Sequence, residues 1–158
     1  MLLSNQFIGH INRDPYSDIV FTNGSLPRAG PFHSVTEFND WLSAMIKRGK
    51  EHHWPGIKTE DIPDPYRQLL PDDATVIFTH ADLNPRNIMV SPESPCRITA
   101  LIDWEQSGWY PDYWEFCKAE FTVVTRSEWA TEYLPRFLEE PSDSCIDGFW
   151  SYSKAYGY

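Results

Sequence analysis

The chain has 158 residues, of which 41% are hydrophobic and 15% aromatic, and its formal net charge is −10. This composition is typical of one globular domain, and the negative charge without a basic stripe excludes nucleic acid as a partner. No run reaches the roughly 18 apolar residues of a membrane span, and three widely spaced cysteines form no disulfide or zinc pattern. We expect a single cytoplasmic domain over residues 1–158.

Residues 1–31 contain few periodic runs and many chain breakers, including Asp14-Pro15 and Gly30-Pro31. Such pairs are typical of turns. The apolar, β-branched stretch Ile19-Val20-Phe21 predicts one short strand. We therefore expect an irregular N-terminal segment over residues 1–31.

The clearest helix is expected to begin at Ser34. Residues 34–37 form a capping box, and apolar residues then recur at helical spacing through Ile46. Gly49 is expected to end this helix. A proline-rich connector follows over residues 54–74, with a short helix expected at residues 65–70.

The segment of residues 75–105 contains two β-like runs on either side of a proline-rich turn, at 88–90 and 98–102. This pattern predicts a β-hairpin. A polar loop, residues 80–87, precedes the hairpin and follows an apolar run at 76–78. The sequence therefore predicts a hairpin that carries a polar loop at one end.

Two carboxylates and a carboxamide are expected to meet at that end. Asp82 and Asn87 belong to the polar loop before the first strand, and Asp103 directly follows the second strand. Such groups at one opening are suited to hold a divalent cation or to move a proton.

The remaining chain predicts further helices. Gln106 to Pro111 is expected to be a Gly/Pro loop, with Pro111 at the first position of a helix. Ser127 is expected to cap another helix, which Pro135 bends or ends. The aromatic tail, residues 145–158, predicts one more short helix. The expected fold class is α+β, mostly helical.

Two segments resemble a known family. Residues 80–87, HADLNPRN, fit the HxDxxxxN catalytic loop of the protein-kinase-like phosphotransferases, and residues 102–105, IDWE, fit their second metal-binding motif. Together they resemble the aminoglycoside phosphotransferase and choline kinase branch, especially its fungal members. The resemblance spans residues 32–119 and implies the C-terminal lobe of the kinase-like fold, in which a β-hairpin carries the active-site loop.

The resemblance implies a role for each site residue. Asp82 would orient a substrate hydroxyl and accept its proton, while Asn87 and Asp103 would hold the magnesium ions of a nucleoside triphosphate. His80 would anchor the loop through its ring nitrogens, and a role as proton carrier stays open.

The ATP-clamping lobe of that fold has no counterpart in the sequence. Residues 1–31 contain neither a GxGxxG loop nor a lysine, and the chain is about half as long as two lobes require. The chain is thus a piece of a longer phosphotransferase or a complete protein with one lobe, and its ordinary start and end favour the latter. For one acidic lobe, we expect no tight ATP binding. Such a protein would use either Mg²⁺ without ATP or no cofactor.

Three functions follow from these alternatives. The first is a stand-alone enzyme that uses Asp82, Asp103 and His80 for ATP-independent acid/base chemistry on a small organic molecule of secondary metabolism, such as cyclisation, dehydration or isomerisation. The second is a Mg-ATP-dependent small-molecule phosphotransferase whose N-terminal lobe is supplied elsewhere. The third is a non-catalytic ligand-binding or scaffold protein. The missing clamp favours the first.

The substrate is expected to bind among aromatic and acidic side chains near the predicted site. Trp104, Trp109 and Tyr110 are expected to line a concave opening that Glu105 edges. The aromatic face left by an absent lobe also predicts self-association into a homo-oligomer.

Overall fold

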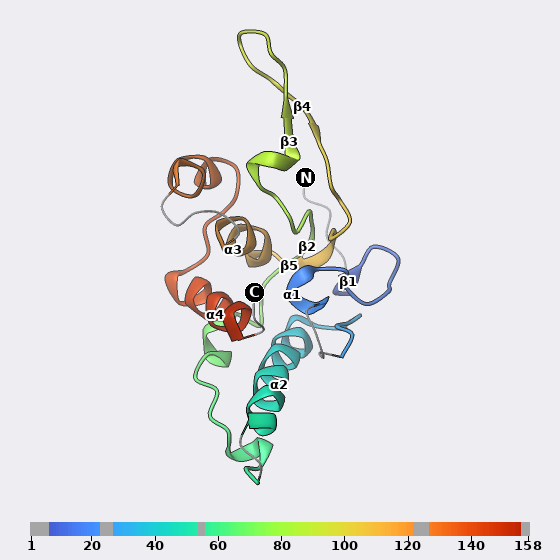
Figure 1. The fold of residues 1–158 in the computed structure, drawn as a ribbon, viewed down its shortest axis with the longest axis vertical. Helices are drawn as coiled ribbons and strands as arrows, with labels where there is room; N and C mark the ends of the chain where they lie inside the picture. The colour runs from blue at the N-terminus through green and yellow to red at the C-terminus, as the bar shows by residue number, and fades with distance from the viewer. Residues whose placement is uncertain (1–6, 23–26, 54–55, 122–126, 156–158) are drawn as a thin grey trace.

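Three short antiparallel strands form a central sheet in the order β1-β5-β2. They are β1 (Gly9–His10), β5 (Gly108–Pro111) and β2 (Val76–Thr79). The fold, obtained as a computed structural model and drawn in Figure 1, is described for residues 7–22, 27–53, 56–121 and 127–155. In Figure 1 the helices lie to one side of this sheet and below it, and the combination confirms the predicted α+β class.

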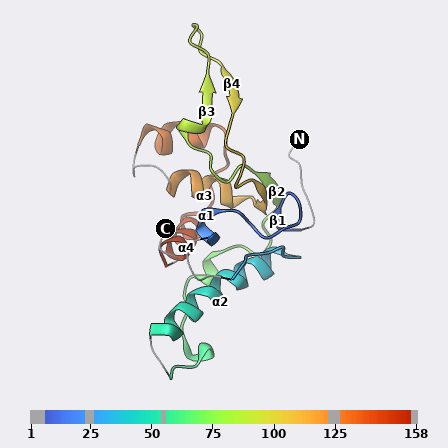
Figure 2. The same ribbon diagram turned by 45° about the vertical axis from the view of Figure 1, so that its right-hand side comes forward.

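The predicted hairpin is present as a separate two-stranded sheet. Strands β3 (Ile88–Val90) and β4 (Ile98–Leu101) pair antiparallel, with Ile88 opposite Leu101. Figures 1 and 2 show that the hairpin projects from the body of the molecule. Its apolar side chains are largely exposed, for example 67% for Ile98. Self-association through the aromatic face left by an absent lobe stays a prediction.

Helix α2 (Val35–His53) begins where the capping box predicted. The Glu37 N–H donates to Ser34 Oγ at 3.1 Å, and Glu37 Oε2 accepts from the His33 N–H at 2.8 Å. The prediction that Gly49 ends the helix was wrong. Gly49 does not adopt the left-handed conformation of a helix cap, and a glycine inside a helix costs only about 1 kcal/mol.

The predicted strand at residues 19–21 is instead a one-turn helix, α1 (Ile19–Thr22). Asp18 determines this turn, because its Oδ1 accepts from the Val20 N–H at 2.9 Å and its carbonyl oxygen accepts from the Phe21 N–H at 2.9 Å. The N-terminal segment is also less irregular than expected, since it contributes β1 and a β-bridge between Ile8 and Phe32.

The expected loop before the next helix is the central strand β5, and α3 (Tyr113–Phe121) starts after Pro111 rather than at it. Gly108 is required there because an added Cβ would lie 2.7 Å from the carbonyl oxygen of Gly9. Pro111 is tolerated because it is the last strand residue, where its missing N–H interrupts no further pairing.

The C-terminal part is helical, as predicted. The carbonyl oxygen of Ser127 accepts from the Thr131 N–H at 3.0 Å, so Ser127 begins a helical segment. This segment is a π-helical turn followed by a 3₁₀ turn that contains Pro135. The predicted tail helix is α4. The remaining elements are η1 (Thr59–Asp61), η2 (Arg67–Leu69), η3 (Pro85–Asn87), η4 (Trp129–Tyr133), η5 (Leu134–Arg136) and α4 (Asp143–Ala155).

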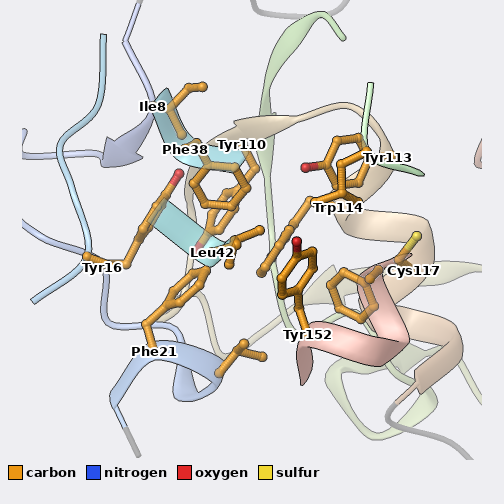
Figure 3. Close-up of a cluster of buried hydrophobic side chains, with 14 of the residues drawn as sticks. Ile8, Tyr16, Phe21, Phe38, Leu42, Tyr110, Tyr113, Trp114, Cys117 and Tyr152 are labelled. Carbon is orange, nitrogen blue, oxygen red and sulfur yellow. The ribbon is translucent and has the colours of Figure 1, made fainter. Parts of the chain in front are cut away.

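Aromatic side chains dominate the core (Figure 3). Trp114 of α3 is 1% exposed and contacts Phe21 of α1, Phe38 of α2, Tyr110 of β5 and Phe149 of α4, at ring-centroid distances of 4.9–5.4 Å. One side chain thus joins four elements, which makes α3 the platform of the fold. None of the helices in the described part of the chain has the length and apolarity to cross a membrane.

Candidate active site

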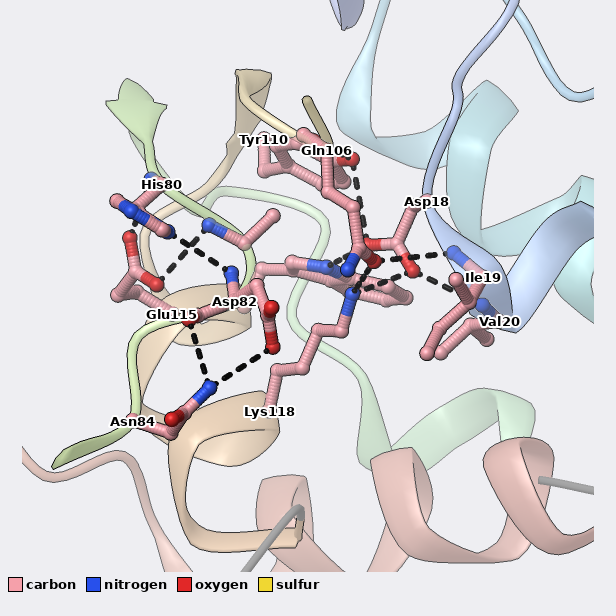
Figure 4. A network of polar contacts seen from close by, with 12 residues as sticks. Asp18, Ile19, Val20, His80, Asp82, Asn84, Gln106, Tyr110, Glu115 and Lys118 are labelled. Carbon is pink, nitrogen blue, oxygen red and sulfur yellow. Dashed lines mark hydrogen bonds and ion pairs between the residues drawn. The ribbon is translucent and has the colours of Figure 1, made fainter. Parts of the chain in front are cut away.

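The polar loop between β2 and β3 holds Asp82 in a defined position. Asn87 Nδ2 donates to Asp82 Oδ2 at 3.0 Å and to the Asp82 carbonyl oxygen at 2.9 Å. Asn84 Nδ2 donates to Asp82 Oδ1 at 3.3 Å, as Figure 4 shows, and its Oδ1 accepts from the Arg86 N–H. The structure therefore brings Asp82 and Asn87 together, and amides contact both carboxylate oxygens of Asp82.

Asp103 leaves β4 next to the same loop. The preceding residue, Ile102, donates its N–H to the Asn87 carbonyl oxygen at 3.0 Å, and its own carbonyl oxygen lies 2.9 Å from His80 Nε2. Asp103 is exposed and has a left-handed backbone, with φ at 65°. Within the described part of the chain, no hydrogen bond to its carboxylate is formed. The backbone thus places Asp103 beside the loop, with its carboxylate open to solvent.

His80 is 4% exposed and uses both ring nitrogens within the loop. Nδ1 accepts from the Asp82 N–H at 3.2 Å, which leaves the proton on Nε2 to be donated to Ile102. These bonds connect the Asp82 loop to the end of β4. Of the two roles left open by the sequence, the geometry favours anchoring.

The expected aromatic lining is only partly in place. Trp104 is 42% exposed, and its ring lies 4.4 Å from His80 and stacks on Phe78. Glu105 is exposed, and Trp109 is partly buried beside Phe78. A role of these three in binding a substrate stays a prediction.

Tyr110 is a correction. It is 0% exposed, its ring stacks on Tyr16 and Trp114, and its hydroxyl donates to the Gln106 carbonyl oxygen at 3.0 Å. On strand β5, Tyr110 and Trp109 point to opposite faces of the sheet, so only one of them can face outward. Tyr110 belongs to the core and cannot line an open site.

Glu115 of α3 was missed by the sequence reasoning. Its Oε2 accepts from the His80 N–H at 2.6 Å, and its Oε1 accepts from the Ala81 N–H at 3.1 Å. Burial raises the pKa of Glu115 from its usual value to about 7, although both backbone hydrogen bonds oppose this. The sequence indicated only that Glu115 is an acidic residue in the first turn of a helix. A favourable interaction with the helix dipole explains such a residue as well as a role in the site does.

A buried ion pair on the same helix was also missed. Lys118 Nζ donates to Asp18 Oδ1 and to Gln106 Oε1, both at 2.6 Å, and the two charged side chains are 1% and 0% exposed. Figure 4 shows this network beside Glu115. It connects the N-terminal segment to the platform helix, so α3 holds that segment through Lys118 and the Asp82 loop through Glu115.

The residues of the loop fit a magnesium ion in part. In the described ranges, no cluster of three or more His, Cys, Asp or Glu has the arrangement of a metal site. However, Asn87 directs its Nδ2 at Asp82, and no hydrogen bond to its Oδ1 is formed among the described residues. The Asn87 carbonyl oxygen accepts from the N–H of Ile102, which directly precedes Asp103. Carboxylate and carboxamide oxygens are the donors that Mg²⁺ prefers, and Mg²⁺ takes its other ligands from water and phosphate.

A family model described as phosphotransferase enzyme family (APH) matches residues 26–143, which is well over half of the chain. The chain belongs to this phosphotransferase family. The matched range contains the Asp82 loop, the hairpin, Asp103 and all of α3. It confirms the predicted relationship to aminoglycoside phosphotransferase and choline kinase-like enzymes, and thus a kinase-like small-molecule enzyme at the level of the family. No curated protein and no solved structure shows significant similarity to the chain.

Proposed function

We propose that this chain is the C-terminal lobe of a Mg-ATP-dependent small-molecule phosphotransferase and contains its acceptor-activating and metal-binding residues. The proposal depends on the side-chain amides of Asn84 and Asn87, which fix the Asp82 carboxylate. Asp103 follows β4 next to the same loop, to which the preceding residue is hydrogen-bonded. Family membership supports the reaction class, since enzymes of the family normally use Mg-ATP.

In this proposal Asp82 orients the acceptor. Its carboxylate accepts a hydrogen bond from a substrate hydroxyl and takes the proton as the hydroxyl oxygen bonds to the γ-phosphorus of ATP, while the bond from that phosphorus to the bridging oxygen breaks and ADP leaves. Asn84 and Asn87 donate to the carboxylate from the side and so restrict its rotation. Phosphoryl transfer depends mainly on positioning, and a carboxylate held at both oxygens meets that need.

Asn87 Oδ1 and the Asp103 carboxylate would hold the magnesium ion. When bound, the ion neutralises charge on the transferred phosphate and links it to the protein. This contribution matters here because the formal net charge of the chain is −10, which repels a triphosphate in the absence of a bridging cation.

Calorimetric titration of the chain with ATP, with and without Mg²⁺, tests the metal and nucleotide roles. We expect weak binding, because the ATP-clamping lobe is not part of this chain, that needs Mg²⁺ and that Asp103→Asn weakens further, at least about tenfold, because the charged ligand is lost. Asparagine tolerates the left-handed backbone at this position, so the variant changes the charge without new strain. Glu93→Gln, on an exposed residue between β3 and β4, is the matched control and should bind as the wild type does.

The catalytic role of Asp82 needs a second assay. In transfer from labelled Mg-ATP to a panel of hydroxyl-bearing small molecules, Asp82→Asn should keep nucleotide binding and lose transfer. Equal binding of ATP with and without Mg²⁺, or by the wild type and Asp103→Asn, would contradict the proposal.

Acid/base chemistry without a nucleotide is the second candidate, and it is favoured by one observation. The exposed Trp104 ring beside His80 offers an apolar surface for an organic ligand next to the Asp82 loop. Conversion of a substrate in the presence of EDTA and without ATP, abolished by Asp82→Asn, would support this candidate over phosphoryl transfer.

A further inference from the structure

The carboxylate of Glu115 lies under the active-site loop without a direct cationic partner in the described structure. It is 7% exposed, and its oxygens accept from the backbone N–H groups of His80 and Ala81. Lys118, one turn along the same helix, directs its ammonium group to Asp18 and Gln106. Glu115 is therefore bound to the loop backbone and not to a salt-bridge partner.

The two residues that Glu115 holds form the turn that leads into Asp82. Ala81 is fully buried and has a φ of 63°, a left-handed conformation that side chains with a Cβ rarely adopt. Such a backbone persists only where its surroundings hold it. The next N–H, that of Asp82, is held by His80 Nδ1, so the path from His80 to Asp82 depends on the hydrogen bonds around Ala81.

We propose that Glu115 is a positioning residue for Asp82, and that only its ionised form holds the loop in the geometry that presents Asp82 to a substrate. This inference rests on the role proposed for Asp82 above.

The requirement for the ionised form follows from the hydrogen bonds. Both Glu115 oxygens face N–H donors, so both must act as acceptors. A protonated carboxyl group has one hydroxyl oxygen, which is uncharged, is a weaker acceptor than a carboxylate oxygen and must direct its own hydrogen away from the backbone N–H. One of the two bonds is then weakened, and the left-handed turn at Ala81 is held less firmly. Because burial raises the pKa of Glu115 to about 7, this change falls near neutral pH.

Among the described residues, the titratable groups that interact with Glu115 are Lys118 on the same helix, Asp18 before α1, Tyr110 on β5 and His80 on the loop. Lys118 and Asp18 act on the pKa of Glu115 in opposite directions and are paired with each other. Burial raises the pKa of Tyr110 well above its usual value, which keeps it neutral. His80 also accepts a hydrogen bond in the loop, so its protonation has to be distinguished from that of Glu115.

Amide hydrogen exchange of His80 and Ala81, measured by NMR on the full chain, tests the proposal. In the wild type we expect the protection factors of both amides to fall at least about tenfold between about pH 8 and about pH 6. Glu115→Gln, which has the same shape without the charge, should show low protection at both pH values. Glu120→Gln is the matched control, because Glu120 lies on the same helix and burial also raises its pKa. This control should behave as the wild type does.

Three results would overturn the inference. Wild-type protection in Glu115→Gln at about pH 8 would show that Glu115 does not hold the loop. A wild type without pH dependence would refute the need for ionisation, and a pH response that persists in Glu115→Gln would assign the effect to another group. Should Glu115→Gln fail to fold, the wild-type profile, compared with the titration of the Glu115 carboxyl carbon, decides the matter. Exchange needs no turnover, so failure of the phosphotransferase assay leaves this test intact.

Discussion

Replacing Lys118 with methionine removes the only cation that contacts the Asp18 carboxylate in the described part of the chain. Both side chains are at most 1% exposed, and Lys118 Nζ lies 2.6 Å from Asp18 Oδ1. Breaking a buried ion pair by removing one partner costs about 3 to 5 kcal/mol, because the remaining charge stays buried. Two neutral donors, the Val20 N–H and Trp114 Nε1, remain on Asp18, and the Tyr110 hydroxyl lies 3.3 Å from its Oδ2. We therefore expect a loss near the lower limit, about 3 kcal/mol.

A double-mutant cycle separates the ion pair from the packing of its side chains. Asp18→Asn alone should also cost about 3 kcal/mol, since it leaves a buried ammonium group. With both substitutions neither residue of the pair is charged, and the loss should be about 2 kcal/mol, from donors that face the new amide. The expected coupling energy is therefore about 4 kcal/mol.

Urea unfolding, followed by tryptophan fluorescence, gives the free energy of unfolding of the four proteins, and equal slopes against urea would show that compactness is unchanged. A domain of this kind has about 5 to 15 kcal/mol of stability in total, so each single variant should remain measurable at low temperature. A coupling energy below about 0.5 kcal/mol would refute the reasoning, because the two side chains would then contribute independently.

Two further predictions concern stability. Burial raises the pKa of Glu115 from 4.5 to about 7, so the folded protein keeps a proton that the unfolded chain releases between these values. The free energy of unfolding should therefore fall by about 3 kcal/mol as the pH rises through this range. Urea titrations at several pH values measure this dependence, and Glu115→Gln should remove it. If both proteins show the same slope, another group is responsible. Ser34→Ala should lower the free energy of unfolding by about 1 kcal/mol through loss of the α2 cap, while Ser34→Thr should retain most of the wild-type stability. Equal urea midpoints for the two variants would contradict the capping role.

Local sequence was sufficient where neighbours along the chain supply the hydrogen bonds. The Ser34 cap sits within one turn of its partners, and β3 and β4 are joined by a short turn. The Asp82–Asn87 contact spans five residues. Such features can be predicted from spacing alone, and the HADLNPRN and IDWE segments led to the family that the comparison confirmed.

The errors arose where a distant partner decided the local structure. Ile19-Val20-Phe21 has a strand-like composition, but Asp18 closes a helical turn over it. The Asp18 carboxylate is held in the core by Lys118, which is 100 residues away in the sequence. Residues 108–111 have the composition of a loop, yet they form the central strand because β1 and β2 pair with both of its edges. Tyr110 was expected at the site and lies in the core for the same reason.

The sequence by itself determined the hairpin, the capped helix α2, the family and the residues of the Asp82 loop, since each depends on groups close together in the chain. Only the tertiary structure decided what holds that loop. Glu115 is 35 residues from His80, and Lys118 is 100 residues from Asp18. Burial changes the chemistry of these charges, and burial depends on the packing of α3 against the whole fold.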